Sequence, residues 1–124
     1  MPRVLIADDE ESMRTLVARA IAMDGHETVT AEDGAEALDI LSRDKGAFDL
    51  LLTDIKMPVM DGIALALAAA RDFPDLTILL MTGFADQRER AHGLNAIVHD
   101  VITKPFSVAD IRTAVAAALA ERKA

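Results

Sequence analysis

The chain has 124 residues, the length of one ordinary domain, and 52% of them are apolar against 27% charged, which is typical of a folded globular protein rather than a disordered one. Its net charge of -8 and its aromatic content of only 3% disfavour binding to nucleic acids, which depends on basic and stacking side chains. Cysteine is absent, so disulfides and thiolate metal sites are excluded. No apolar run reaches the length of a signal peptide core or a membrane span, and we therefore expect a cytoplasmic protein without membrane partners.

The predicted elements alternate along the chain between short apolar runs and longer amphipathic segments. In chain order, the strands are 4–7, 27–30, 50–53, 78–81 and 101–103, and the helices are 13–21, 35–43, 63–71, 86–94 and 108–122. Four of the strands are apolar at successive positions, which is typical of strands covered on both faces in a parallel sheet. The strand 27–30 alternates polar and apolar residues instead, and so predicts an edge position.

Most of the predicted helices rest on apolar residues at helical spacing. These residues are, helix by helix, Met13, Leu16, Val17, Ala20 and Ile21; Ala37, Leu38 and Leu41; Ile63, Leu67 and Ala70; Val108, Ile111, Val115 and Leu119. The last helix has a marked start, because Ser107 can cap it and Asp110 follows as in a capping box. The segment 86–94 is charged and has few apolar anchors, so we expect it to be the least firmly packed helix.

Strands that alternate with helices across short loops, without linkers or repeats, predict a single α/β domain over residues 1–124. The fold class that we expect is a flavodoxin-like (βα)5 domain with a doubly wound, five-stranded parallel sheet. The natural strand order at this size is 2-1-3-4-5.

Polar and charged residues follow four of the five predicted strands at the point where each strand ends. Asp8 and Asp9 follow the first strand, Asp54 the third, Thr82 the fourth and Lys104 the fifth. The carboxyl ends of parallel strands share one edge of the sheet, and ligands bind there at the switch point between strands 1 and 3. We therefore expect these five residues to meet in one crevice.

Three carboxylates in one crevice repel one another, so positive charge must balance them. Lys104 supplies one positive charge, and a divalent cation would supply the rest. Hard oxygen ligands with no thiolate or imidazole nearby favour Mg²⁺ or Mn²⁺ over Zn²⁺.

With these residues in order, the whole chain resembles the receiver domain of two-component response regulators. The resemblance rests on Asp8-Asp9, on Asp54 in LLTDIKMPVMDG, on Thr82 in LLMTG and on Lys104-Pro105-Phe106, each placed after its own predicted strand. It implies that a histidine kinase or histidine phosphotransferase phosphorylates Asp54. It also implies that Asp8, Asp9, Asp54 and the backbone carbonyl of Lys56 bind Mg²⁺, and that Thr82 and Lys104 contact the phosphoryl oxygens.

The resemblance further implies a cis peptide between Lys104 and Pro105 and an output surface made by the fourth helix, the fifth strand and the fifth helix. Because the last predicted helix closes the fold by about Arg122, we expect a stand-alone bacterial receiver that switches its affinity for a downstream protein or relays the phosphoryl group. A weaker resemblance is to the single-domain receivers of alphaproteobacteria that control regulated proteolysis.

One position departs from the pattern of many receivers, which carry a tyrosine or phenylalanine three residues before the lysine of the fifth strand. Here that position is Val101. Phe84 and His99 could replace the aromatic ring of the switch, and a surface role for either residue is equally open.

Simpler interpretations of the same residues stay open at this point. Asp8 and Asp9 could cap the first helix, and Lys104 could be an ordinary salt-bridge partner. The three histidines, His26, His92 and His99, have no metal-ligand spacing and are expected at the surface or in satisfied positions.

Two other functions compete with a receiver. A small phosphatase with an aspartyl-phosphate intermediate normally carries a second acid two residues after its nucleophile, where this chain has Lys56. A pseudo-receiver that keeps the fold without phosphorylation usually lacks an acid or the lysine, and here all are present. We therefore expect no enzyme activity beyond self-phosphorylation and autodephosphorylation.

Overall fold

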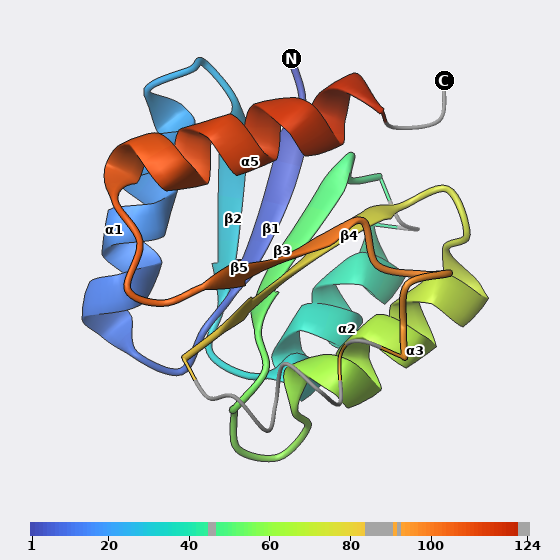
Figure 1. The fold of residues 1–124 in the computed structure, drawn as a ribbon. Helices are drawn as coiled ribbons and strands as arrows, with labels where there is room; N and C mark the ends of the chain where they lie inside the picture. The colour runs from blue at the N-terminus through green and yellow to red at the C-terminus, as the bar shows by residue number, and fades with distance from the viewer. Residues whose placement is uncertain (45–46, 84–90, 92, 122–124) are drawn as a thin grey trace.

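The computed structural model describes residues 1–44, 47–83, 91 and 93–121 and shows a parallel sheet between two layers of helices (Figure 1). The five strands run in the order β2-β1-β3-β4-β5. The predicted α/β class and strand order are therefore confirmed.

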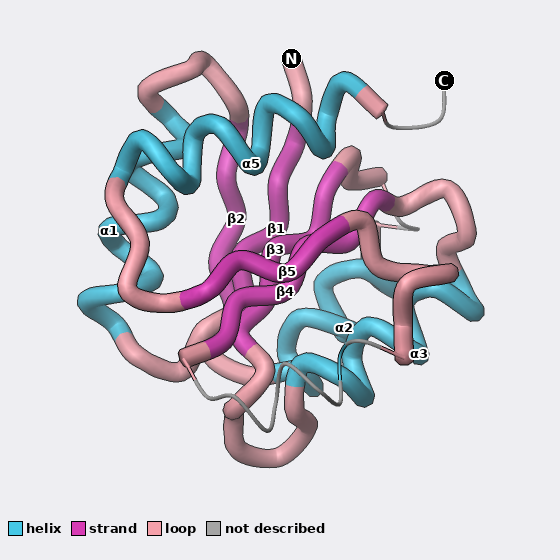
Figure 2. Tube along the Cα trace, viewed as in Figure 1, coloured by secondary structure: helices cyan, strands magenta, loops and turns pink. Residues whose placement is uncertain are grey.

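Strands and helices alternate along the chain, as the colouring by secondary structure shows (Figure 2). The strands are β1 (Arg3–Ala7), β2 (Glu27–Ala31), β3 (Leu50–Asp54), β4 (Thr77–Thr82) and β5 (Asp100–Thr103). The helices are α1 (Glu11–Ala22), α2 (Gly34–Arg43), α3 (Gly62–Asp72) and α5 (Val108–Ala120). The helix expected at 86–94 lies largely outside the described residues. None of the described helices is long and apolar enough to cross a membrane.

Each face of the sheet has its own apolar core. Helices α1 and α5 cover one face, where Val17 and Ile111 pack with Ile6 and Leu52 of the sheet. Helices α2 and α3 cover the opposite face, where Leu5 of β1 and Leu51 of β3 belong to the second core. Alternate residues of β1 and β3 are therefore buried on opposite sides, which explains why these strands are apolar without interruption.

The two edge strands are less buried than the central ones. Strand β2 lies at one edge, as its alternating pattern predicts. Strand β5 lies at the other edge, and Val101 and Ile102 are half-buried. Val101 packs with the core on the α2 and α3 face, and Ile102 packs with the core on the α1 and α5 face. Strand β5 is therefore covered on both faces as expected, but less completely than the central strands.

Helix periodicity placed two leucines incorrectly. Leu16 of α1 is 38% exposed and Leu67 of α3 is 50% exposed, although both belong to the predicted core faces. In α3 the buried residues are instead Leu65, Ala66 and Ala69, together with the first turn. This helix is apolar nearly all round, so its pattern does not determine which side packs on the sheet.

Side-chain caps determine where three of the helices begin. Asp33 accepts from the backbone NH of Glu36 at the start of α2, and Asp61 accepts from Ala64 at the start of α3. The predicted capping box of α5 is present, with Ser107 and Asp110 each accepting from the other's backbone NH. These caps set the first turns of helices that start beside the carboxyl edge of the sheet.

Gly62 lets the start of α3 lie directly against the end of β3. A Cβ atom at this position would overlap the carbonyl oxygen of Asp54 and lie 2.9 Å from the Cα of Ile55. The backbone NH of Gly62 also donates to the carbonyl of Ile55 at 2.8 Å. The close approach requires glycine because both obstructing groups are backbone atoms.

Replacing Gly62 by alanine should therefore lower the free energy of unfolding by about 2–3 kcal/mol, since the added methyl group forces the end of β3 and the start of α3 apart. Urea unfolding followed by circular dichroism measures the change. Gly93→Ala is the matched control, because a Cβ there meets nothing within 4 Å and should change stability by less than about 0.5 kcal/mol. Equal losses in the two variants would contradict this account of Gly62.

Candidate functional site

The register of the sheet brings the predicted site residues to a single edge. Ala7 pairs with Thr53, and Asp54 pairs with Met81, so β1, β3 and β4 end side by side. Asp8 and Asp9 leave β1 at this edge, and Asp54 is the last residue of β3. The predicted meeting of residues from separate strands is confirmed for these acids.

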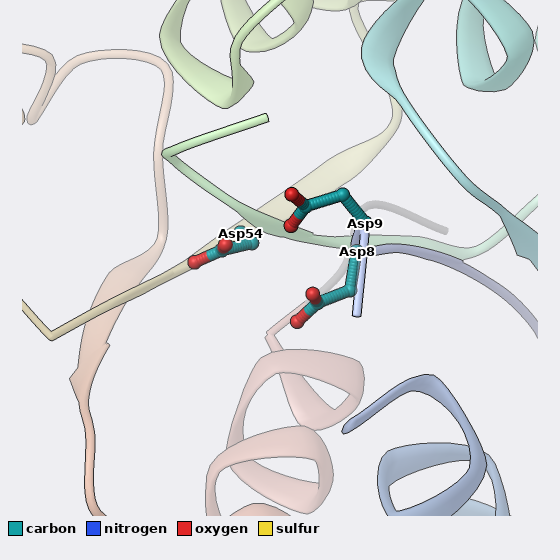
Figure 3. Close-up of side chains that lie close together, drawn as sticks. All are labelled: Asp8, Asp9 and Asp54. Carbon is teal, nitrogen blue, oxygen red and sulfur yellow. The ribbon is translucent and has the colours of Figure 1, made fainter. Parts of the chain in front are cut away.

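The three carboxylates form a compact cluster. Each of Asp8, Asp9 and Asp54 offers one oxygen, and these oxygens all lie within 4.8 Å of one another (Figure 3). Asp8 is fully buried and Asp54 is 7% exposed, whereas Asp9 faces solvent. The cluster is thus built on two buried acids with one exposed acid at its rim.

Lys104 balances part of this negative charge. Its Nζ lies 3.3 Å from Oδ1 of Asp54 and 3.5 Å from Oδ2 of Asp8. Its backbone NH donates to the carbonyl of Thr82 at 2.8 Å, and its peptide bond to Pro105 is cis, as the resemblance implies. Lys104 therefore does form salt bridges, as the simpler interpretation holds, but its partners are the site acids Asp8 and Asp54.

Burial changes how the two inner acids titrate. Burial raises the pKa of Asp54 to about 6, the Lys104 ammonium opposes this rise, and the carboxylate of Asp8 adds to it. Burial also raises the pKa of Asp8, against the lowering effect of the backbone NH of Glu10 and of Lys104. Both acids are thus held in surroundings that penalise their charged forms, and a cation placed among them would relieve that penalty.

The donor set fits a divalent cation that prefers oxygen. Asp8 Oδ2 is buried and has no hydrogen-bond partner among the described residues, apart from its ion-pair contact with Lys104. Three carboxylates with one neighbouring ammonium leave excess negative charge, and among the described residues no thiolate or imidazole belongs to the cluster. Such a set suits Mg²⁺ or Mn²⁺.

The first helix does not use these acids as caps. Its N-cap is Glu10, which makes no side-chain capping bond, and Asp8 Oδ1 instead accepts from the backbone NH of Glu10 at 2.9 Å. The simpler interpretation of Asp8 and Asp9 as N-caps is therefore wrong. The first turn of α1 instead begins beyond the loop that carries both acids.

The two remaining predicted site residues, Thr82 and Lys56, differ in burial. Thr82 is the buried last residue of β4, next to the strand end that carries Asp54. Lys56 follows Asp54 by two residues in the loop after β3, and its side chain is exposed. The structure thus places both in the loops or strand ends around the acids.

Of the possible substitutes for the aromatic switch residue, His99 lies away from the acids. The backbone NH of His99 donates to Ile78, at the edge of the sheet opposite the acids, and its Nδ1 lies 3.3 Å from Glu121. Phe84 and His92 lie outside the described residues. Val101 is half-buried opposite Leu80 of β4, among the apolar residues on the α2 and α3 face of the sheet.

Two residues that the sequence analysis did not single out donate hydrogen bonds to the backbone carbonyls of the site acids. Thr53 Oγ1 donates to the carbonyl of Asp54 at 2.9 Å. Arg14 Nη1 donates to the carbonyl of Asp8, also at 2.9 Å. Neither residue carries a sequence signal for this role, because each bonds a backbone oxygen that any residue provides.

Comparisons with known proteins agree with the geometry. Residues 4–116 match the family model of the response regulator receiver domain. Response regulator MprA of Mycobacterium avium (strain 104) is 32% identical over 121 residues, which cover 98% of this chain and 52% of that protein. The chain thus spans about half the length of the curated relatives it matches.

Solved structures show the same fold. A CheY-like receiver domain protein from Methanospirillum hungatei JF-1 matches with a TM-score of 0.88 and 28% identity, over 98% of this chain and 95% of that one. Response regulator protein TrrA from Thermotoga maritima, solved in complex with Mg²⁺ and BeF, matches with a TM-score of 0.83 and 29% identity, over 94% of this chain and 98% of that one.

In the presence of EDTA, replacing Asp54 by asparagine should stabilise the protein at neutral pH by about 1–2 kcal/mol. Because the pKa of Asp54 is about 6 in the native state and 3.8 in its ordinary state, the native protein binds this proton more tightly than the unfolded chain. The contribution of Asp54 to the free energy of unfolding therefore falls as pH rises from about 4 to about 6. The difference in the free energy of unfolding between Asp54→Asn and the wild type grows over the same pH interval.

Urea unfolding at a series of pH values measures this gap. Asp39→Asn on the exposed side of α2 serves as the control and should keep the wild-type profile. Parallel profiles for wild type and Asp54→Asn would show that Asp54 is not held with a raised pKa.

Proposed function

The chain belongs to the family of response regulator receiver domains, and we propose that it is a phosphorylation-controlled switch in which Asp54 accepts the phosphoryl group. The observation that carries this proposal is the pairing of a buried Asp54 with the Lys104 ammonium at 3.3 Å, beside two further carboxylates at the end of β1. Asp54 ends β3, the strand between β1 and β4, whereas Asp8 and Asp9 follow the neighbouring strand β1.

In the proposed reaction, an oxygen of the Asp54 carboxylate attacks the phosphorus of the donor. The bond from phosphorus to the donor's nitrogen or oxygen breaks, and the leaving group takes the electron pair. With a pKa of about 6, Asp54 is mostly ionised at neutral pH and so is available as the nucleophile. The product is an acyl phosphate on Asp54.

The cation ligands that we propose are Asp8, Asp9, Asp54 and the backbone carbonyl of Lys56. Their oxygen donors favour Mg²⁺, with Mn²⁺ as a substitute. When bound, the cation neutralises the negative charge that gathers on the transferring phosphoryl group. Asp8 contributes its buried Oδ2, and Asp9 contributes the exposed carboxylate at the rim.

Lys104 and Thr82 are the residues that we assign to the phosphoryl oxygens. The Lys104 ammonium pairs with Asp54 before transfer, and the added phosphoryl oxygens offer it stronger acceptors afterwards. The Thr82 hydroxyl would donate to the same group from the neighbouring strand end. Phosphorylation adds about -1.5 to -2 charge at this point, which draws both donors inward.

The partners that we propose follow from the family. Receiver domains are phosphorylated by histidine kinases or histidine phosphotransferases, and such a donor would act on this chain in the cytoplasm. A downstream protein would read the change on the output surface of the family, to which β5 and α5 contribute among the described residues. Val101 provides no aromatic ring for that change, so we propose that movement of Thr82 and of the chain after it carries the signal instead.

Two rival functions, an aspartyl-phosphate phosphatase and a pseudo-receiver, differ from a receiver in their chemistry. The proposed chemistry is limited to self-phosphorylation and autodephosphorylation, since Lys56 stands where an aspartyl-phosphate phosphatase needs its second acid. A pseudo-receiver would keep the fold without accepting phosphate. Covalent labelling of Asp54 therefore separates a receiver from a pseudo-receiver, whereas Lys56 is the residue that argues against the phosphatase.

Incubation with acetyl phosphate and Mg²⁺ should add the mass of one phosphoryl group to the intact protein, and Asp54→Asn should abolish the addition. Asparagine keeps the size of the side chain but removes the nucleophilic oxygen. Intact-protein mass spectrometry at neutral pH measures the label before the acyl phosphate hydrolyses. Asp72→Asn, an exposed acid at the end of α3, should be labelled like the wild type, and full labelling of Asp54→Asn would place the nucleophile elsewhere.

Mg²⁺ should raise the melting temperature, because a ligand that binds only the native state stabilises it by about 2.7 kcal/mol at a hundredfold excess over its dissociation constant. Asp9→Ala should remove most of this rise while leaving the metal-free protein folded, since Asp9 is exposed. Differential scanning calorimetry with and without Mg²⁺ gives the shift. Asp75→Ala, at the opposite edge of the sheet, should keep the full rise, and an equal rise in Asp9→Ala would show that the cation binds elsewhere.

A further inference from the structure

Arg14 lies in the first turn of α1 and contacts the backbone of the loop that carries Asp8 and Asp9. Its side chain is only 15% exposed, and its Nη1 donates to the carbonyl oxygen of Asp8 at 2.9 Å. Its Nη2 lies 3.7 Å from Oε1 of Glu32, just beyond the end of β2. The guanidinium group thus ties α1 to the loop that carries the acids and to the neighbouring loop.

The carbonyl that Arg14 holds belongs to the peptide group that joins Asp8 to Asp9. A peptide group is planar, so a hydrogen bond that orients this carbonyl also orients the backbone nitrogen of Asp9. The other side of Asp8 is held as well, because its backbone NH donates to the carbonyl of Ala31 at 3.1 Å. Hydrogen bonds to the carbonyl and to the NH of Asp8 therefore set the direction in which the Asp9 side chain projects from the backbone.

The carboxylate of Asp9 lacks such support of its own. Among the described residues, no hydrogen bond or ion pair holds this side chain, which is exposed at the rim of the cluster. Its oxygen nevertheless lies within 4.8 Å of those of Asp8 and Asp54. The backbone beneath Asp9 is therefore the main constraint on where its carboxylate points.

We propose that Arg14 is a positioning residue, which orients the Asp8–Asp9 peptide group so that the Asp9 carboxylate faces Asp8 and Asp54 in a geometry that binds a divalent cation. This inference rests on the proposed function to the extent that the cluster binds Mg²⁺. The planar guanidinium suits the role, because it can donate to the carbonyl with one nitrogen while another faces Glu32.

The charge of Arg14 and its hydrogen bond make opposite contributions to cation binding. A positive charge beside the cluster repels a divalent cation, so removing the charge alone would tighten binding. Losing the hydrogen bond frees the Asp8–Asp9 peptide group and would weaken binding. The direction of the change therefore separates a positioning role from a purely electrostatic one.

Isothermal titration of the full chain with Mg²⁺ tests the proposal. Arg14→Met should bind Mg²⁺ about tenfold more weakly or worse, in the range found when residues that orient metal ligands are removed. Arg14→Lys keeps a donor and should recover part of the affinity. Arg19→Met is the matched control, since it removes the same charge from the exposed side of the same helix and should bind as tightly as the wild type or slightly tighter.

Glu32→Gln separates the two contacts of Arg14. It weakens the distant, exposed ion pair but leaves the bond to the Asp8 carbonyl, so Mg²⁺ affinity should stay near the wild-type value. A loss as large as that of Arg14→Met would overturn the assignment of the carbonyl bond as the decisive contact. Circular dichroism at the titration temperature confirms that each variant is folded.

Two results distinguish the failure of this inference from the failure of the proposed function. Tight Mg²⁺ binding by the wild type, with equal or tighter binding by folded Arg14→Met, would overturn the positioning role alone. The absence of Mg²⁺ binding by the wild type would overturn the metal site on which the inference rests.

Discussion

The repulsion among Asp8, Asp9 and Asp54 is the constraint on which the organisation of this domain depends. The parallel sheet brings the three acids together at one edge, and the Lys104 ammonium offsets only part of their charge. Burial of Asp8 and Asp54 makes the remaining charge more costly, as their raised pKa values show. The apolar layers on both faces of the sheet must therefore stabilise an arrangement that the site itself opposes.

Backbone contacts hold this arrangement in place, because the side chains of the cluster repel one another. Gly62 lets α3 approach the carbonyl of Asp54, and Thr53 donates to the same carbonyl. Arg14 bonds the carbonyl of Asp8, while the backbone NH of Lys104 bonds Thr82. A site supported in this way can gain or lose charge at its side chains while the strand ends that carry them stay in position. That property suits the reversible phosphorylation that we propose for Asp54.

Much of the fold follows from residue patterns that a sequence displays directly. The uninterrupted apolar runs of β1, β3 and β4 indicate strands covered on both faces, and the capping box at Ser107 marks where α5 begins. The errors arose where the local pattern is ambiguous. Leu67 belongs to a helix that is apolar nearly all round, so its periodicity does not show which side packs on the sheet.

The sequence by itself determined the class of fold, the strand order and the identity of the acids and the lysine that meet at the sheet edge, because strand ends in a parallel α/β domain always share that edge. Only the tertiary structure decided how these groups are held. The burial of Asp54, the 3.3 Å contact with Lys104 and the bond from Arg14 to the Asp8 carbonyl depend on the packing of segments that are distant in the chain or on backbone atoms common to all residues. A residue pattern carries no record of a backbone oxygen, so Arg14 could be found only once α1 was placed against the loop that it supports.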